Sequence, residues 1–318
     1  MWQRKPSVGP MRPRPARCRS MTDAVATGKH ASPALPSPLP VLSGQQWAGA
    51  CDCHIHINDP RYPYAAGADL HPPAATVADY RQLQARLGTR RVVVVQPSSY
   101  GTDNRCTLDA VAELGLDVAR AVVVVDASTS ADDVAAMHQR GARGVRFNLL
   151  RPSPVAAGHM HAVARLIAPW GWHLQLHASA DQIAALAPAI RDLPVPVVFD
   201  HLARLPGHGG STHPAFDVVA QLLQQQRAWL KLSGAELDGA AEAPGYASAA
   251  RVAQRFIALS PDRLVWGSNW PHPAIHKTGD AAPDDAALLR WLSACVPDSA
   301  VQRQILLDNA CNLYGFSV

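Results

Sequence analysis

Short runs of β-branched and aliphatic residues alternate with longer stretches of helical spacing from about residue 50 to the end of the chain. Nearly continuous apolar runs of this length are typical of strands that are covered on both faces of a parallel sheet. Between them, apolar residues recur at the spacing of a buried helix face. The predicted strands are residues 50–57, 91–96, 120–126, 144–148, 173–177, 195–201, 228–233 and 263–269. The predicted helices are residues 77–88, 108–115, 133–141, 159–171, 181–193, 215–226, 247–259, 284–296 and 300–315.

Eight strands that alternate with helices predict the fold class α/β, as a distorted (β/α)₈ barrel in a single domain. The alternative is a doubly wound open sheet, which would place a Gly-rich phosphate loop directly after the first strand. The sequence there is CHIHIN (53–58), without glycine, so the barrel is favoured. Residues 1–46 are rich in Pro, Ala, Ser and Arg and lack periodicity. We expect a disordered or extended segment over 1–46 and the barrel over 47–318.

The formal charge of +4 comes from the basic first twenty residues, and the rest of the chain is slightly acidic. The sequence therefore predicts no nucleic-acid partner. No apolar run reaches the roughly 18 residues of a membrane span, and the basic segment lacks the apolar core of a secretory signal. Met21 is a plausible start, so residues 1–20 could be a mis-assigned extension.

The six cysteines show no CxxC spacing and no disulfide framework, so nothing in them requires an oxidising compartment. We expect a soluble, cytoplasmic protein whose partner is a small-molecule substrate. A homo-oligomer is compatible with this composition.

Polar residues follow the predicted strands repeatedly, and the carboxyl ends of barrel strands are where catalytic residues lie. His54 and His56 share one face of the first strand because side chains alternate along a strand. A single histidine at such a position is more often a hydrogen-bonded core residue than a functional one. Four histidines that end three strands favour a site: His54, His56, His177 and His201.

A His-x-His pair with a histidine from another strand is typical of zinc ligation. Such sites usually add a carboxylate that activates the metal-bound water. Here the last strand ends in Asn269, which cannot take up a proton near neutral pH and binds divalent metals poorly. The sequence therefore favours no metal and no required cofactor. If one zinc ion binds, we expect His54, His56 and His177 as its ligands.

The chain from about residue 48 onward resembles the amidohydrolase superfamily, in the branch that contains 2-pyrone-4,6-dicarboxylate lactonase and D-galactarolactone isomerase. The motifs that carry the resemblance are CDCHIHI (51–57), QPSSYGTDN (96–104), GVRFNLL (144–150), LQLH (174–177), FDHLAR (199–204), WLKLSGAE (229–236) and WGSNWPHP (266–273). The resemblance implies that the four histidines surround the reacting carbonyl or its metal, and that the lactonase chemistry proceeds without a metal. It implies a substrate site lined by Ser98, Tyr100, Asn104, Arg146 and Asn148, to which we add His272.

Two residues depart from the branch. Its lactonase carries an aspartate where this chain has Asn269, and an arginine often stands where this chain has Leu237. The pyrone dicarboxylate is therefore not the expected substrate. Hydrolysis would need another base, for which His201 is favoured over Asp200 and His272 because an imidazole titrates near working pH.

Isomerisation of a lactone needs no activated water, because a hydroxyl of the same sugar acid attacks the carbonyl. Asn269 could orient that hydroxyl. We therefore expect an enzyme that hydrolyses or isomerises a lactone of a sugar acid or related carboxylic acid, with Asn269 and the four histidines as its catalytic residues. The alternatives are a mononuclear zinc hydrolase or decarboxylase, and a catalytically inactive barrel that binds a small acid. Replacing Asn269 with Asp is expected to raise water-dependent opening.

Overall fold

Eight parallel strands form the centre of the fold, and their order in space follows their order in the chain. The computed structural model describes residues 1, 41–151, 156–239, 242–243, 245–275 and 281–317. The predicted disordered segment falls mostly outside this range. The strands are β1 (Cys51–Ile55), β2 (Arg91–Val95), β3 (Ala119–Val123), β4 (Ala142–Asn148), β5 (His173–His177), β6 (Val197–Phe199), β7 (Ala228–Leu232) and β8 (Leu264–Trp266). Each of the eight predicted runs contains most or all of one strand, so the predicted (β/α)₈ barrel is confirmed.

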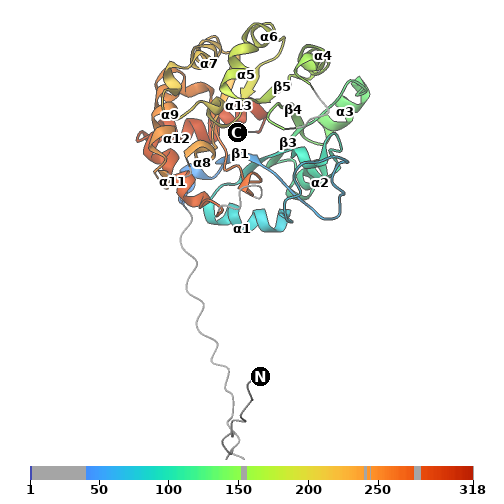
Figure 1. The fold of residues 1–318 in the computed structure, drawn as a ribbon, viewed down its shortest axis with the longest axis horizontal. Coiled ribbons are helices and arrows are strands. Elements are labelled where there is room, and N and C mark those ends of the chain that lie inside the picture. Colours follow the sequence, from blue (N-terminus) through green and yellow to red (C-terminus); the bar gives the residue numbers. More distant parts are fainter. Residues whose placement is uncertain (2–40, 152–155, 240–241, 244, 276–280, 318) are drawn as a thin grey trace, which may run out of the picture. The chain divides into compact units, whose positions relative to one another are not determined.

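Helices surround the strands as a ring (Figure 1). They are α1 (Val77–Leu87), α2 (Arg105–Leu114), α3 (Ala131–Gln139), α4 (Met160–Ile167), α5 (Ala180–Ala185), α6 (Ala187–Arg191), α7 (Pro214–Gln224), α8 (Ala235–Gly239), α9 (Ala247–Leu259), α11 (Asp285–Cys295), α12 (Ser299–Arg303) and α13 (Asn309–Tyr314). None of the described helices has both the length and the apolar character that a bilayer crossing requires.

The predicted helix over 181–193 is instead two short helices, α5 and α6, that meet at Leu186. Pro188 explains the break, because proline has no N–H to donate to the preceding turn and its ring crowds that turn. The predicted helix over 300–315 is likewise interrupted, since a π-helical turn over Gln304–Asp308 separates α12 from α13.

A β-bulge in β1 re-aims the side chains that follow it. Asp52 pairs with Val92 and Ile55 with Val94, so two residues of β1 stand opposite one residue of β2. An extra residue of this kind bends the strand and changes which face later side chains take. Cys51 and Cys53 share a face by strand alternation and pack in the barrel interior with α13, and because of the bulge the next residue, His54, contacts the interior as well.

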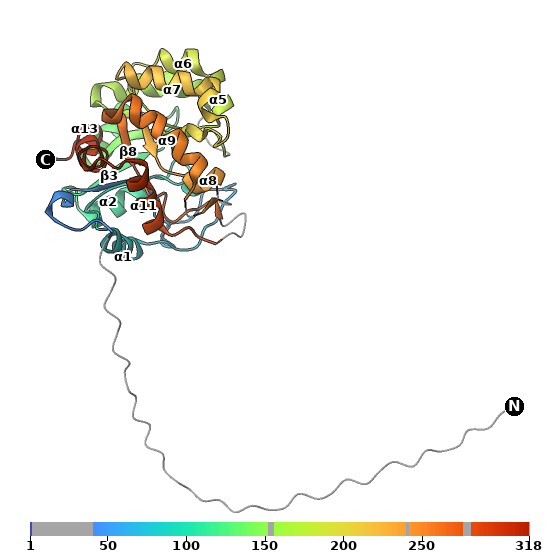
Figure 2. The same cartoon turned by 90° about the vertical axis from the view of Figure 1, so that its left-hand side faces the viewer.

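The barrel closes between β1 and β8 at the carboxyl ends of these strands. The Asn269 N–H donates to the His54 carbonyl oxygen at 2.9 Å, and the His56 N–H donates to the Trp270 carbonyl oxygen at 2.8 Å. Gly267 permits this approach, because a Cβ there would lie 2.6 Å from the Cβ of His54. At the opposite end of the barrel, α13 covers the floor (Figure 2).

The folded unit begins before β1. Val41 and Leu42 donate backbone hydrogen bonds to the carbonyl groups of Arg86 and Leu87, at 3.1 and 2.9 Å. The Leu42 side chain is buried in the main core. The described part of residues 1–46 thus packs against the end of α1.

Candidate active site

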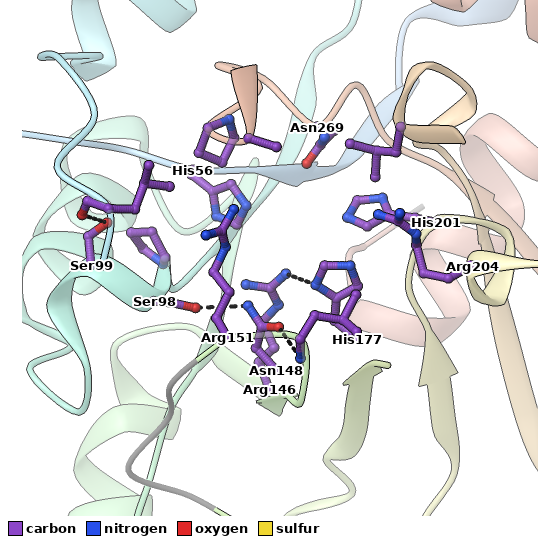
Figure 3. Close-up of a pocket in the computed structure, with 16 residues that line it drawn as sticks. His56, Ser98, Ser99, Arg146, Asn148, Arg151, His177, His201, Arg204 and Asn269 are labelled. Carbon is purple, nitrogen blue, oxygen red and sulfur yellow. Dashed lines mark hydrogen bonds between the residues drawn. The ribbon is translucent and has the colours of Figure 1, made fainter. Parts of the chain in front are cut away.

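A pocket of about 200 Å³ opens at the carboxyl ends of the strands. This is the face of a barrel at which active sites form, because loops from all eight strands meet there. The volume suits a ligand smaller than a drug-sized molecule. The polar residues that line the pocket are His56, Ser98, Ser99, Arg146, Asn148, Arg151, His177, His201, Arg204 and Asn269 (Figure 3).

A buried ion cluster lies beneath the pocket floor. The Lys231 ammonium, fully buried on β7, lies 3.4 Å from Oδ1 of Asp200 and donates to Oε1 of Gln175 at 2.8 Å. Arg146 on β4 donates through Nε to the other carboxylate oxygen of Asp200 at 3.2 Å. Burial alone would raise the pKa of Asp200, but Lys231, His54 and Arg146 outweigh it and hold this pKa well below its usual value.

The same ammonium favours one tautomer for each of the paired histidines. Nδ1 of His54 lies 3.1 Å from Lys231 Nζ and 3.3 Å from Oδ1 of Asp200, and because an ammonium can only donate, this nitrogen accepts from Lys231. The His54 Nε2–H then donates to Nε2 of His56, 3.3 Å away. His56 in turn donates through Nδ1 to the Val95 carbonyl oxygen at 2.8 Å. Every ring nitrogen of this pair therefore has a defined partner.

The four strand-end histidines are neutral near pH 7. Burial lowers the pKa of His56 to about 3, with the nearby charge of Arg146 adding to the effect. Burial, together with neighbouring cations or imidazoles, also lowers the pKa values of His54, His177 and His201 well below the usual range. A neutral imidazole carries one N–H and one lone pair. Both nitrogens of His54 and of His56 are already engaged, so His177 and His201 are the two that can offer one of them to a substrate.

His177 and His201 present nitrogens from two different strand ends. Arg146 donates to Nδ1 of His177 at 3.3 Å, which leaves the Nε2–H of His177 as a donor; that buried nitrogen has no partner among the described residues. His201 contacts the Ser233 hydroxyl through Nδ1 at 2.9 Å.

His201 begins a turn, His201–Arg204, whose four residues all have positive φ angles. Non-glycine residues in this region cost roughly 1–2 kcal/mol each. Such strain is retained where the surrounding structure over-determines it, often at functional sites. Here the turn aims both His201 and Arg204 at the pocket.

Asn269 belongs to a second buried network. Its Nδ2 donates to Oε1 of Glu236, at the start of α8, at 3.0 Å. His272 lies between two carboxylates, with Nδ1 3.3 Å from Glu236 and Nε2 3.0 Å from Asp285. Burial opposes a charge on His272, but these two hydrogen bonds outweigh it and raise the pKa of His272 to about 9.

Seven of the eleven sequence-predicted site residues line the pocket: His56, Ser98, Arg146, Asn148, His177, His201 and Asn269. His54 lies one layer below, fully buried against Lys231. The remaining three, Tyr100, Asn104 and His272, are not among the residues that line the pocket.

Tyr100 is buried, and its hydroxyl hydrogen-bonds the backbone of Asp59 instead of facing the pocket. Asn104 bridges the backbone of Val124 through both ends of its amide, at 2.8 and 2.9 Å, so it joins two loops. His272 is occupied by its two carboxylates. In each case hydrogen bonds to other protein groups hold the side chain away from the pocket.

The sequence analysis missed four charged residues of the site: Arg151, Arg204, Lys231 and Glu236. Arg204 and Glu236 ended motifs quoted above, FDHLAR and WLKLSGAE, but neither lies on a strand. Lys231 offered the clearest signal, because a lysine within an apolar strand must be buried with a partner.

A group of three residues, His54, Asp200 and His201, brings ligand atoms within 4.8 Å of one another, a separation that could surround a metal ion. It differs from the predicted set of His54, His56 and His177. In this group the Lys231 ammonium already contacts His54 and Asp200, and the lone pair of His54 faces it. A divalent cation would have to displace that ammonium, so the group fits a metal poorly.

Comparisons with known proteins agree with this geometry. The family model described as amidohydrolase matches residues 51–316. A 2-pyrone-4,6-dicarboxylate hydrolase from Comamonas testosteroni is 32% identical over 84% of this chain and 90% of its own length. D-galactarolactone isomerase from Agrobacterium fabrum is 30% identical over 85% of this chain and 92% of its own length. The solved structure of a probable 2-pyrone-4,6-dicarboxylic acid hydrolase from Acinetobacter baumannii, with citric acid bound, has a TM-score of 0.73 at 25% identity and covers 84% of this chain and 100% of its own.

Proposed function

Because the chain belongs to the amidohydrolase family, and its relatives at about 30% identity are lactone hydrolases and isomerases, we propose that it acts on a lactone of a sugar acid or related carboxylic acid without a required metal. The observation that carries this proposal is a pocket that combines carbonyl-polarising donors with an amide, rather than a carboxylate, at the end of the last strand. The isomerisation of the lactone is the favoured reaction.

The charge of the pocket selects an anionic substrate. Arg146, Arg151 and Arg204 line it, and the described lining residues include no Asp or Glu. Arg146 is paired with buried Asp200, and Arg151 forms a partly exposed ion pair with Asp69 at 3.1 Å. A carboxylate on the substrate would suit these guanidinium groups, which bind carboxylates through bidentate contacts. The relative with bound citric acid carries its polycarboxylate in the same fold.

The donors for the lactone carbonyl are already oriented. The free Nε2–H of His177 and the guanidinium of Arg146 lie side by side in the pocket (Figure 3). Fixed donors of this kind stabilise the oxyanion of a tetrahedral intermediate, which is usually the largest contribution to acyl-transfer catalysis. Because Arg146 holds Nδ1 of His177, the donor tautomer exists before the substrate binds.

Isomerisation uses a hydroxyl of the substrate as the nucleophile. The hydroxyl first donates to the oxygen of the Asn269 amide, which aligns it. It then turns its single proton toward a neutral His201, which takes the proton as the new carbon–oxygen bond forms. The intermediate then collapses, the original ring oxygen leaves, and His201 returns the proton to it. No water is consumed, and the tethered nucleophile provides a high effective concentration.

Hydrolysis is the second candidate, since His201 could equally take a proton from water and several relatives are named hydrolases. A zinc enzyme is disfavoured by the position of Lys231. The cytoplasmic location and the absence of a nucleic-acid partner remain predictions from composition.

The test is a panel of sugar-acid γ- and δ-lactones, incubated in H₂¹⁸O with chelator-treated full-length protein and followed by ¹³C NMR and mass spectrometry. Isomerisation predicts conversion of one lactone into another without ¹⁸O uptake, whereas hydrolysis incorporates ¹⁸O into the free acid. Activity that appears only after zinc is added would favour the zinc enzyme. Binding of the acids without turnover of any lactone would favour the inactive barrel.

A further inference from the structure

Glu236 is a buried carboxylate directly behind the pocket wall. It lies at the start of α8, just after β7, and its side chain is 8% exposed. Its Oε1 atom receives the amide of Asn269 and contacts His272, while its Oε2 atom has no partner among the described residues. Burying an anion with an unpartnered oxygen is costly. A function for this carboxylate at the site would explain its retention.

The hydrogen bonds of this network fix which way the Asn269 amide points. Oε1 of Glu236 lies 3.3 Å from Nδ1 of His272 and accepts from Nδ2 of Asn269 at 3.0 Å, while Nε2 of His272 lies 3.0 Å from Asp285. The amide of Asn269 must therefore turn its NH₂ group toward Glu236. Its oxygen then faces the pocket, as Figure 3 shows. A free asparagine could present either group to a substrate; this one presents an acceptor.

We propose that Glu236 is the positioning residue that commits this site to isomerisation, because it holds the Asn269 oxygen toward the substrate hydroxyl and excludes a second carboxylate from position 269. This inference deepens the function proposed above and rests on it. Glu236 acts through Asn269 and does not line the pocket.

The exclusion follows from electrostatics. An aspartate at position 269 would place its carboxylate about 3 Å from Oε1 of Glu236, the distance now bridged by an N–H donor. Two carboxylates this close share one proton instead of both ionising. In the Asn269→Asp variant alone, the one remaining negative charge would be shared with Glu236 and held by the bridging proton, so it would be a weaker base than a free carboxylate. This changes the expectation from the sequence that the substitution restores hydrolysis.

The experiment compares the wild type with Asn269→Asp, Glu236→Gln and the double variant that combines them. The readouts are the rates of hydrolysis and of isomerisation, separated by ¹⁸O uptake. In the double variant, the amide introduced at position 236 can donate to the new carboxylate and leave it ionised. We expect its hydrolysis rate to exceed that of Asn269→Asp by at least tenfold. Equal rates in the two proteins would overturn the proposal.

A second comparison separates positioning from structural support. In Glu236→Gln, Nδ1 of His272, 3.3 Å from this position, favours the glutamine oxygen there while residue 269 is still an asparagine. An acceptor for Asn269 is thus retained, and the isomerisation kcat should stay within about threefold of the wild type. Glu236→Ala frees the amide and should lower kcat at least tenfold with little change in KM. Glu113→Ala, which removes an exposed glutamate paired with Arg81, is the matched control. Equal loss in the Gln and Ala variants would indicate a purely structural role and overturn the proposal.

A measurement without substrate keeps the inference distinct from the proposed function. The chain has six asparagines, so selective ¹⁵N-asparagine labelling gives few side-chain amide signals, and the Asn269→Asp variant assigns one of them. We expect the Asn269 Nδ2 protons to be protected from exchange in the wild type and in Glu236→Gln but not in Glu236→Ala. Rapid exchange in the wild type would overturn the positioning role even if lactone turnover is observed. Protection without any lactone turnover would leave the positioning geometry intact but would overturn its proposed catalytic consequence.

Discussion

The Lys231→Met substitution tests the buried ion cluster that supports the site. Lys231 is fully buried and serves three partners: Asp200, His54 and Gln175. Methionine approximates the length of the lysine stem and removes only the ammonium and its hydrogen bonds. The variant therefore isolates the contribution of one positive charge at the barrel centre.

The expected loss can be worked from these contacts. Removing one partner of a buried ion pair typically costs about 3–5 kcal/mol, because the remaining charge is left without compensation. Asp200 retains Arg146 at 3.2 Å and the Gln175 amide at 3.0 Å, so a value near the lower limit is appropriate. A loss of about 3 kcal/mol should lower Tm by roughly 6–12 °C for a chain of this size.

The assay is urea unfolding of the wild type, Lys231→Met, Asp200→Asn and the double variant. Because the two side chains interact directly, the double variant should be more stable than the sum of the single effects predicts, by at least about 1 kcal/mol. The interaction between Lys231 and Asp200 would be refuted if the losses of unfolding free energy in the two single variants simply added. It would also be refuted if Lys231→Met lost less than about 1 kcal/mol. Lys231→Met also frees Nδ1 of His54, so zinc content measured by mass spectrometry should rise above that of the wild type.

Three further outcomes are expected. His177→Ala removes the free N–H donor and should lower kcat on the active lactone more than tenfold with little change in fold by circular dichroism; a wild-type kcat would remove His177 from the site. Arg204→Met should raise KM for an anionic lactone, and high salt should reduce the difference between the two proteins; a KM unchanged at low salt would contradict the anion-binding role. The pKa of His272 is raised to about 9 in the folded state, so its contribution to stability is fully present below its ordinary pKa near 6.5 and is lost as pH rises through 9. This pKa shift corresponds to about 3 kcal/mol of stability. Urea unfolding at several pH values should therefore show that the stability advantage of the wild type over His272→Gln shrinks from pH 6.5 to 9.5. An advantage independent of pH would contradict a charged His272 between the two carboxylates.

The fold could be predicted from the sequence because its periodicity is strong and regular. Each apolar run becomes one strand, since a strand covered on both faces must be apolar along its length. The break between α5 and α6 was also visible in principle, because Pro188 occupies the second position of the second helix. The apolar spacing of a helix continues across residues 181–193, so this spacing alone did not reveal the break.

The site was predictable only where side chains follow strands directly. His56, His177 and Asn269 line the pocket because strand geometry fixes where the ends of parallel strands meet. Tyr100 and Asn104 lie in loops, and their hydrogen bonds to backbone groups distant in sequence decide their orientation. Sequence patterns carry no information about such partners.

Glu236 and Arg204 were missed for a related reason. Arg204 reaches the pocket only because the four residues from His201 onward adopt left-handed backbone angles, which no residue type in that turn signals. Glu236 supports the site through its contact with Asn269, which lies in the loop after β8 and is distant in sequence.

The seam between β1 and β8 has a consequence for how the protein is made. The backbone bonds that close it join His54 and His56 to Asn269 and Trp270, which a ribosome adds only after all eight strands have been made. Until then the edge of β1 has no partner, and an unpaired apolar strand is prone to aggregation. We expect nascent chains that end before β8 to depend on chaperones and to lack the pocket, so that barrel closure and active-site assembly are the same folding event.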